Sequence, residues 1–330
     1  MARVVVVGAG LAGLAAAREL VQDGHTVTLL DKGRSPGGRL ATRRIGQARL
    51  DHGAQFFTIR TNAFAAFVQP HLESGLVYEW CRGFSEHGDG HARYAALGGM
   101  NAWAKSLALD LDVRCATLVF AIRPGANTSG AAWDVALDDG SSVPADALVV
   151  TCPVPQSYSL LVSAEVALPE ELVRTEYDKT IALLLTLDSA PLVPEPGGLN
   201  NPTDMLSFVA DNQRKGISDA PALTVHANAA WSDAHWNDPH EEVMQALHEA
   251  AQTYLGAAVI TESQLKKWRF ATPRTVWPEP CWVAAEAAGP LVLAGDAFAG
   301  PRVEGAVLSG IAAARSLMSQ WCSPPHNAQQ

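Results

Sequence analysis

Cysteine is scarce in this sequence, and its spacing excludes a common class of site. The five cysteines form no Cys-x-x-Cys pair and no cysteine–histidine spacing suited to zinc. We therefore expect no metal site. An odd, scattered set of cysteines indicates reduced thiols, and hence a cytoplasmic protein.

The chain also lacks a basic excess. It has 24 Lys and Arg residues against 34 Asp and Glu residues, a formal net charge of -10. This balance disfavours nucleic acid and anionic membranes as partners, because no surplus of positive charge exists to neutralise phosphates. Apart from the glycine-punctuated first 20 residues, no segment approaches 18 uninterrupted apolar residues, so we expect no transmembrane helix. The 330 residues, 48% of them hydrophobic, suffice for two globular domains that act on a small molecule.

The beginning of the chain has the pattern strand, glycine-rich turn, helix, strand. Gly8, Gly10 and Gly13 form a G-x-G-x-x-G motif directly after the apolar stretch Val4–Val7. Gly8 allows a tight turn, Gly10 lets backbone N–H groups approach a pyrophosphate, and Gly13 lets the helix pack on the strand. The positive end of the helix then faces the phosphates.

Asp31 ends the second strand, at the spacing expected for an acid that binds ribose hydroxyls. Together with the glycine motif it predicts a Rossmann-type dinucleotide-binding unit. These residues do not distinguish FAD from NAD.

The middle third of the chain differs in character. Ile181–Leu187, Leu206–Ala210 and Ala222–Ala227 are expected strands, and 239–255 an expected helix. We predict an α/β fold: a Rossmann-type cofactor domain with an inserted α+β substrate domain, an antiparallel sheet plus a helix. The expected cofactor domain is discontinuous, with residues 1–75, 96–153 and 285–330, and the expected substrate domain has residues 76–95 and 154–284. Residues 32–44 are expected to be irregular.

Downstream segments favour FAD. Gly37-Gly38-Arg39, the stretch 50–57 (LDHGAQFF), Gly295-Asp296 and 302–306 (RVEGA) resemble the FAD-binding amine-oxidase superfamily. The resemblance implies that Arg39 contacts the pyrophosphate, that Gln55 and Phe56 lie beside the flavin ring, and that Asp296 binds the ribityl chain. The implied cofactor-binding residues are Gly8, Gly10, Leu11, Ala12, Gly13, Asp31, Lys32, Gly38, Arg39, Gln55, Phe56, Gly295, Asp296, Val303, Glu304 and Gly305.

Within that superfamily the sequence resembles the renalase-like branch, through the stretches 51–58 (DHGAQFFT) and 302–310 (RVEGAVLSG). This resemblance implies oxidation of dihydro-isomers of NAD(P)H to NAD(P)+, with hydride transfer to flavin N5 and O2 as the electron acceptor. The sequence lacks the Ser-Gly-Gly-Cys setting that tethers flavin in monoamine oxidases, so non-covalent FAD is expected.

Aromatic walls would position the substrate ring and exclude water. The candidates are Phe56, Phe57, His226 and Trp268, with Trp231 as a further possibility; simple core packing is the alternative for each tryptophan and for His226. Lys179 is assigned no role. Two other functions stay open at this point: a flavin amine oxidase or desaturase that acts on an amine or an apolar substrate, and a non-catalytic FAD-binding redox sensor.

Overall fold

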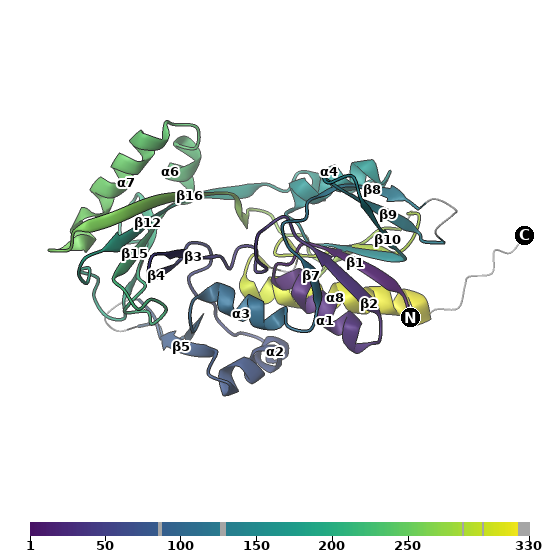
Figure 1. The fold of residues 1–330 in the computed structure, drawn as a ribbon, viewed down its shortest axis with the longest axis horizontal. Helices are drawn as coiled ribbons and strands as arrows, with labels where there is room; N and C mark the ends of the chain where they lie inside the picture. Colours follow the sequence, from purple (N-terminus) through teal and green to yellow (C-terminus); the bar gives the residue numbers. More distant parts are fainter. Residues whose placement is uncertain (85–87, 126–129, 286, 299, 323–330) are drawn as a thin grey trace, which may run out of the picture. The chain divides into compact units, whose positions relative to one another are not determined.

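The protein is described here by a computed structural model that covers residues 1–84, 88–125, 130–285, 287–298 and 300–322 (Figure 1). Its contacts divide the chain into two compact units. Unit 1 contains residues 1–38, 107–176 and 275–330, and unit 2 contains residues 39–106 and 177–274.

Unit 1 is built on a six-stranded sheet in the order β17-β18-β11-β1-β2-β7, in which every pair is parallel except β17 with β18. A second, antiparallel sheet has the order β10-β9-β8. The elements of unit 1 are β1 (Arg3–Val7), α1 (Leu11–Gln22), β2 (Thr26–Leu30), β7 (Asp112–Arg114), β8 (Val119–Pro124), β9 (Trp133–Leu137), β10 (Ser142–Ala145), β11 (Ala147–Val150), α4 (Val154–Ser163), α5 (Glu170–Val173), β17 (Trp282–Val283), β18 (Leu291–Leu293) and α8 (Val303–Cys322).

The central strands of unit 1 are apolar along their whole length because both faces of the sheet are covered. Val4 to Val7 and Ala147 to Val150 are all buried. Helices α1 and α8 pack against each other, and a Cβ atom at Gly310 would lie 2.0 Å from the Ala12 carbonyl oxygen (Figure 1). Small residues therefore set the close approach of these two helices.

Unit 2 is built on a five-stranded antiparallel sheet in the order β13-β14-β15-β12-β16, with the hairpins β3–β4 and β5–β6. Its elements are β3 (Thr42–Ile45), β4 (Ala48–Asp51), α2 (Asn62–Glu73), β5 (Val77–Cys81), β6 (Arg93–Ala96), α3 (Met100–Leu107), β12 (Tyr177–Leu187), β13 (Gly198–Asn200), β14 (Leu206–Asp211), β15 (Ala222–Ala227), α6 (Ala229–Ala234), α7 (His240–Leu255) and β16 (Ile260–Pro273).

The two faces of this sheet differ, since successive strand residues point to opposite sides. One face, with Ile181, Leu183 and Val225, packs against Val243 and Leu247 of α7. We call the other face, which carries Ala182, Thr224, His226 and Phe208, the open face. The β3–β4 hairpin packs against one end of it, where Ile45, Ala48 and Leu50 contact Leu184 and Ala222.

The predicted fold class is confirmed: a Rossmann-like parallel sheet is combined with a separate antiparallel sheet and its covering helix. The prediction that residues 32–44 are irregular is wrong for the last three of them, because β3 begins at Thr42 and pairs with β4. Gly46 supplies the positive φ of the hairpin turn, with φ 56°. The 14-residue strand β16 was not among the predicted strands.

The compact units have other bounds than the predicted domains. Residues 39–75 and 96–106 belong to unit 2, because β4 packs against β15, and 275–284 belong to unit 1, because β17 pairs with β18. Residues 154–176 also belong to unit 1. Packing alone does not say which unit binds a cofactor, so the assignment of cofactor and substrate domains stays a prediction.

Candidate functional site

The predicted site residues fall into two groups, one in each unit. The glycine motif, Asp31, Lys32, Gly38, Gly295, Asp296 and residues 303–305 lie in unit 1. Arg39, Gln55, Phe56, Phe57, His226 and Trp268 lie in unit 2. We describe each group by itself.

The glycine-rich turn of unit 1 is made by backbone. Gly8 has φ 105° and donates its N–H to the Leu30 carbonyl at 2.8 Å. A Cβ atom at Gly13 would lie 1.9 Å from the Gly8 carbonyl oxygen, so no larger residue fits there without a backbone shift. At Gly10, by contrast, an added Cβ atom would meet nothing within 4 Å. The turn is closed around Gly8 and Gly13 and open at Gly10.

Gly10 directly precedes α1, and no side chain caps this helix. The first turn of α1 contains no acidic residue, so no side chain of the helix itself offsets the positive end of its dipole. Leu11 and Ala12 are 4% exposed, which leaves their backbone rather than their side chains for a ligand. Open space at an uncapped helix N-terminus fits a bound phosphate group.

Asp31 links this turn to the next loop. Its Oδ2 accepts a hydrogen bond from the Ala9 N–H at 2.6 Å, and its Oδ1 accepts one from the Gly33 N–H at 2.6 Å. The Gly37 N–H in turn donates to the Ala9 carbonyl at 2.8 Å. The acid therefore lies beside the glycine-rich turn, as the predicted ribose contact requires, and Lys32 next to it is exposed.

The C-terminal part of unit 1 completes the group. Gly295 has φ 143°, and its N–H donates to Ser309 Oγ of α8 at 2.9 Å. Asp296 and Glu304 are 9% and 7% exposed. Val303 and Gly305 lie in the first turn of α8, which Val303 begins.

In unit 2 the stretch 51–55 begins at the end of β4 and lies beside β15, where Thr224 Oγ1–H donates to the Asp51 carbonyl. The His52 ring stacks on Trp268 with centroids 5.3 Å apart, and Trp268 Nε1–H donates to the His52 carbonyl at 2.6 Å. Gln55 Nε2–H donates to the carbonyls of Asp51 at 2.7 Å and Gly53 at 3.2 Å. His226 Nε2 lies 3.4 Å from Gln55 Nε2. We call His52, Gln55, His226 and Trp268 the polar cluster.

Two atoms of the polar cluster are buried without a hydrogen-bond partner: Gln55 Oε1 and His52 Nδ1. The orientation of the Gln55 amide follows from its two carbonyl partners, which require Nε2 on their side and leave the oxygen unpaired. Gln55 itself is 6% exposed. A buried acceptor without a partner costs free energy unless a ligand or water supplies a donor. The cluster therefore fits a ligand that carries N–H or O–H groups.

Both imidazoles are uncharged at neutral pH. Burial, with a smaller contribution from the nearby Lys266, lowers the pKa of His52 to about 4. Burial also lowers the pKa of His226 to about 4, with smaller contributions from His52 and Lys215. Neither ring is an acid at neutral pH.

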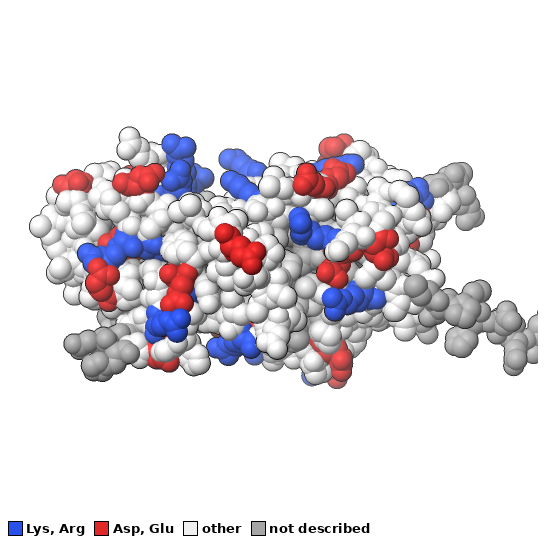
Figure 2. All heavy atoms as spheres, turned by 90° about the horizontal axis from the view of Figure 1, so that it is seen from below, with Lys and Arg blue, Asp and Glu red and all other residues white. Residues whose placement is uncertain are grey.

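The charges around the cluster are mostly positive. Lys266 lies across from Ala182 in the sheet, and its pKa is lowered by burial and by Arg43. Arg43 Nε–H donates to Gln264 Oε1 at 3.2 Å, whereas Arg44 Nε–H donates to the carbonyl of Gly46 in its own turn. Neither Lys266 nor Arg43 forms an ion pair with an acid in the part of the chain that the structure describes. On the molecular face in Figure 2, basic and acidic side chains are interspersed.

The two adjacent phenylalanines point in opposite directions. Phe56 belongs to a half-buried aromatic group with Trp80, Phe84 and Phe208, at centroid distances of 5.0 to 6.4 Å from its own ring. Phe57 is 3% exposed and packs on Phe64, Tyr94 and Trp103. Phe57 is therefore a core residue of unit 2, and Phe56 is the one beside the open face.

Other predicted residues lie elsewhere. Trp231 packs on the α7 side of the sheet and against the His235 ring, away from the open face. Lys179 forms an ion pair with Asp233 of α6 at 2.6 Å. Arg39 Nη1–H donates to the carbonyls of Phe270 at 3.2 Å and Ala271 at 3.1 Å, so part of its guanidinium binds β16. Its contact with a pyrophosphate stays a prediction.

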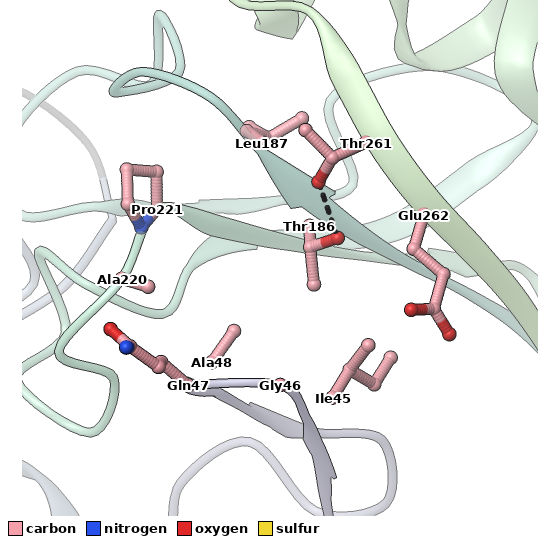
Figure 3. A pocket seen from close by; sticks show the side chains of 10 residues that line it. All are labelled: Ile45, Gly46, Gln47, Ala48, Thr186, Leu187, Ala220, Pro221, Thr261 and Glu262. Atoms are coloured by element: carbon pink, nitrogen blue, oxygen red, sulfur yellow. Dashed lines mark hydrogen bonds between the residues drawn. The ribbon is translucent and has the colours of Figure 1, made fainter.

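A pocket of about 300 Å³ lies at the other end of the same sheet, beneath the β3–β4 turn (Figure 3). Thr186 of β12 and Thr261 of β16 hydrogen-bond to each other in its wall at 2.7 Å. Its lining residues are Ile45, Gly46, Gln47, Ala48, Thr186, Leu187, Ala220, Pro221, Thr261 and Glu262, none of which is a predicted site residue. This pocket is separate from the polar cluster.

Four residues of functional interest were not predicted from the sequence: Phe208, Lys215, Lys266 and Trp80. Alternation along β16 places Lys266 on the same face as Trp268, so recognition of β16 as a strand would have found Lys266. Phe208 lies across from His226 in the paired strands β14 and β15, both of which were predicted, but the register that joins the two residues was not. Lys215 lies in the polar stretch Gln213–Gly216, which carries no signal for burial. No helix among the described residues is long and apolar enough to cross a bilayer, and these residues contain no cluster of three potential metal ligands.

Two known protein families match this sequence. The sequence profile of NAD(P)-binding Rossmann-like domains matches residues 6–69, and that of flavin containing amine oxidoreductases matches residues 62–318. A hydroxyneurosporene desaturase from Rubrivivax gelatinosus is 43% identical over 77 residues, 22% of this chain and 15% of the desaturase. A lysine-specific histone demethylase 1 homolog 2 from Oryza sativa is 50% identical over 71 residues, 21% of this chain and 9% of the demethylase.

The matched segment thus spans less than a sixth of either relative. Among solved structures, wild-type putrescine oxidase bound to putrescine has a TM-score of 0.70 at 16% identity, over 96% of this chain and 99% of that chain. This likeness concerns the fold. Because the oxidoreductase profile covers most of the sequence, the chain belongs to the family of flavin-containing amine oxidoreductases.

Proposed function

We propose that this chain binds FAD non-covalently and oxidises dihydro-isomers of NAD(P)H to NAD(P)+, as the renalase-like sequence motifs imply. The observation that carries the proposal is the polar cluster, which combines a buried, unpaired hydrogen-bond acceptor, Gln55 Oε1, with positive charge. A bound flavin would accept a hydride from the substrate at N5 and pass the electrons to O2, which gives hydrogen peroxide.

The residues of unit 1 fit the nucleotide part of FAD. The open space at Gly10 and the free positive end of α1 suit the pyrophosphate, and Asp31 suits a ribose. Gly295, Asp296 and the first turn of α8 would serve the flavin end. In unit 2, Gln55 and Phe56 would face the ring.

Non-covalent binding is supported by the state of the thiols. The described cysteines Cys81, Cys115, Cys152 and Cys281 are free. Burial raises the pKa of Cys281, the cysteine nearest in sequence to the predicted C-terminal flavin segment, so this thiol stays protonated. FAD is expected in the filtrate after acid precipitation of the protein; a yellow pellet would contradict non-covalent binding.

The charge at the polar cluster favours one substrate class over another. A protonated amine would approach Lys266 and Arg43, which repel a cation. Among the charged groups that shift the pKa values of His52 and His226, Asp51 is the one acid, and it is ion-paired with Lys215 at 2.7 Å. A dihydronicotinamide suits this environment better, because its ring is neutral, its carboxamide donates N–H groups and its phosphates are anionic.

The protein has little chemistry to perform on such a substrate. A dihydropyridine donates a hydride without loss of a proton, so uncharged imidazoles that do not exchange protons are compatible with the reaction. Trp268 and Phe56 would hold the ring and exclude water, and Gln55 would fix its orientation. Lys266 would attract the anionic part of the substrate.

The test is anaerobic stopped-flow mixing of the flavin-loaded protein with the 2- and 6-dihydro isomers of NAD(P)H. We expect rapid bleaching of the visible absorption band of the oxidised flavin, then recovery and peroxide formation when air is admitted. Ordinary NADPH is the control substrate. Absence of bleaching with the isomers would refute the proposal and favour an amine or an apolar substrate.

A further inference from the structure

Beneath the polar cluster lies an ion pair that is completely removed from solvent. Lys215 Nζ donates to Asp51 Oδ2 at 2.7 Å, and both side chains are 0% exposed. Burial lowers the pKa of Lys215, and Asp51 opposes that effect. The ammonium also lies 5.1 Å from the centroid of the Trp80 ring.

Burying two charges is expensive, and an apolar pair of similar volume often stabilises a protein as well or better. Because such a pair is not needed for stability, its position in the fold indicates which neighbouring residues it holds in place. Here the acid is the last residue of β4 and directly precedes His52 in the sequence. The pair thus lies at the base of the stretch that carries His52 and Gln55.

Asp51 is held from several sides. Its Oδ1 accepts from Thr42 Oγ1–H at 2.5 Å and from the Met100 N–H at 2.9 Å. Its own N–H donates to Asn212 Oδ1 at 3.3 Å. Its carbonyl accepts from Thr224 Oγ1–H at 3.0 Å and from Gln55 Nε2–H at 2.7 Å.

Lys215 is equally fixed. Tyr78 O–H donates to the Lys215 carbonyl at 2.5 Å, and the Lys215 N–H donates to the Asp211 carbonyl at 2.9 Å. The side chain spans from this loop, which follows β14, to the end of β4. The Lys215 ammonium thus binds Asp51 directly, and the Asp51 carbonyl orients the Gln55 amide.

We propose that Lys215 and Asp51 are positioning residues of the polar cluster. The buried pair fixes Asp51, and the Asp51 carbonyl holds Gln55 Nε2, so that Gln55 Oε1 faces the ligand. This inference rests on the proposed function in one respect, namely that Gln55 lies beside the flavin. Because a reduced flavin ring carries more N–H groups than the oxidised ring, an acceptor beside it favours the reduced form.

The test compares two charge-free double variants, Asp51→Asn/Lys215→Gln and Asp51→Asn/Lys215→Met. Both avoid an unpaired buried charge, but the first can form an amide–amide hydrogen bond across the gap and the second cannot. The flavin midpoint potential is measured without substrate. We expect the Gln-containing variant to keep the wild-type potential, and the Met-containing variant to lose about tenfold in preference for reduced flavin, which is about 30 mV for a two-electron couple.

Gln55→Leu is the reference for complete loss of the acceptor, and Lys179→Met, which breaks the ion pair with Asp233 on the α7 side of the sheet, is the control. A wild-type potential in both double variants would show that the pair is structural and would overturn the proposal. If neither double variant folds, the single variant Asp51→Asn is measured instead. Its side-chain amide cannot accept all the hydrogen bonds that the Asp51 carboxylate accepts from Thr42, Met100 and Lys215. A wild-type flavin potential in this variant would overturn the positioning role.

The same experiment separates the two proposals. If the wild type does not oxidise the dihydro-isomers but the Met-containing variant shifts the potential, the proposed substrate is wrong and the positioning role stands. If the isomers are oxidised and the potentials of both double variants are unchanged, the proposed function stands and the positioning role is wrong.

Discussion

The glycine-rich turn of unit 1 and the polar cluster of unit 2 are built by different means. The turn is made of backbone: a positive φ at Gly8, a close contact at Gly13 and open space at Gly10. The polar cluster is made of side chains from three separate stretches of chain: His52 and Gln55, His226, and Trp268. The buried Lys215, from a fourth stretch, is ion-paired with Asp51 next to it. A backbone site tolerates almost no change in residue size, whereas a side-chain site depends on burial and charge.

The largest effect in this comparison is expected at Gly13. Its added Cβ atom would lie 1.9 Å from the Gly8 carbonyl, so Gly13→Ala should reduce the free energy of unfolding by about 3 kcal/mol or more. Chemical denaturation followed by circular dichroism measures this. Gly10→Ala is the control, since the space there is open; equal stability of the two variants would contradict the description of the turn.

A comparable loss is expected in unit 2 when the buried ion pair is broken. Lys215→Met leaves Asp51 charged and buried, which should cost about 3 to 5 kcal/mol of unfolding free energy. Lys179→Met removes a partly exposed pair and should cost less than about 1 kcal/mol. Similar losses in the two variants, measured by denaturant titration, would mean that burial of the Lys215 pair has no energetic consequence.

Acid should destabilise the protein through the imidazoles of unit 2. The pKa values of His52 and His226 are lowered to about 4 in the fold, so between pH 4 and 6.5 the unfolded chain binds more protons than the folded one. Stability is therefore complete above about pH 6.5 and decreases toward pH 4, by about 1.4 kcal/mol per pH unit for each ring.

Denaturation series at pH 4 to 7 measure this slope. In the double variant His52→Asn/His226→Asn it should become shallower than in the wild type. An unchanged slope would mean that other groups cause the acid sensitivity.

The smallest effect on stability is expected for Gly10→Ala, which separates FAD binding from folding at the glycine-rich turn. Gly10→Ala should leave stability within about 1 kcal/mol of the wild type but weaken FAD binding about tenfold, because the methyl group occupies the space left for the pyrophosphate. Titration of the apoprotein with FAD, followed by fluorescence quenching, gives the affinity. Unchanged affinity would exclude Gly10 from the cofactor site.

The same contrast explains how much could be predicted from sequence. The turn was predictable because backbone constraints leave glycines at fixed spacing, and the apolar strands beside it are buried on both faces. The polar cluster was predictable in part: Gln55, His226 and Trp268 came from a resemblance and from residue type. Lys215 was not predictable, because a lysine in a polar loop looks solvent-exposed unless its distant partner, Asp51, is known.

Phe56 and Phe57 show the same limit. The sequence gives no sign of which ring turns inward, and the contacts of Phe57 with Phe64 and Trp103 decide it. The strand β16, with its mixture of lysines, glutamate and tryptophan, owes its regularity to pairing with β12 along nearly its whole length rather than to its own apolar pattern.

The central claim is that the positive charge at the polar cluster selects a dihydronicotinamide over an amine. The most direct measurement is the anaerobic rate of flavin bleaching by the 6-dihydro isomer of NADPH and by putrescine, in the wild type and in Lys266→Glu. We expect bleaching by the isomer and none by putrescine in the wild type, and a second-order rate constant for bleaching by the isomer that is at least about tenfold lower in the variant. Faster bleaching by putrescine in the wild type would contradict the central claim.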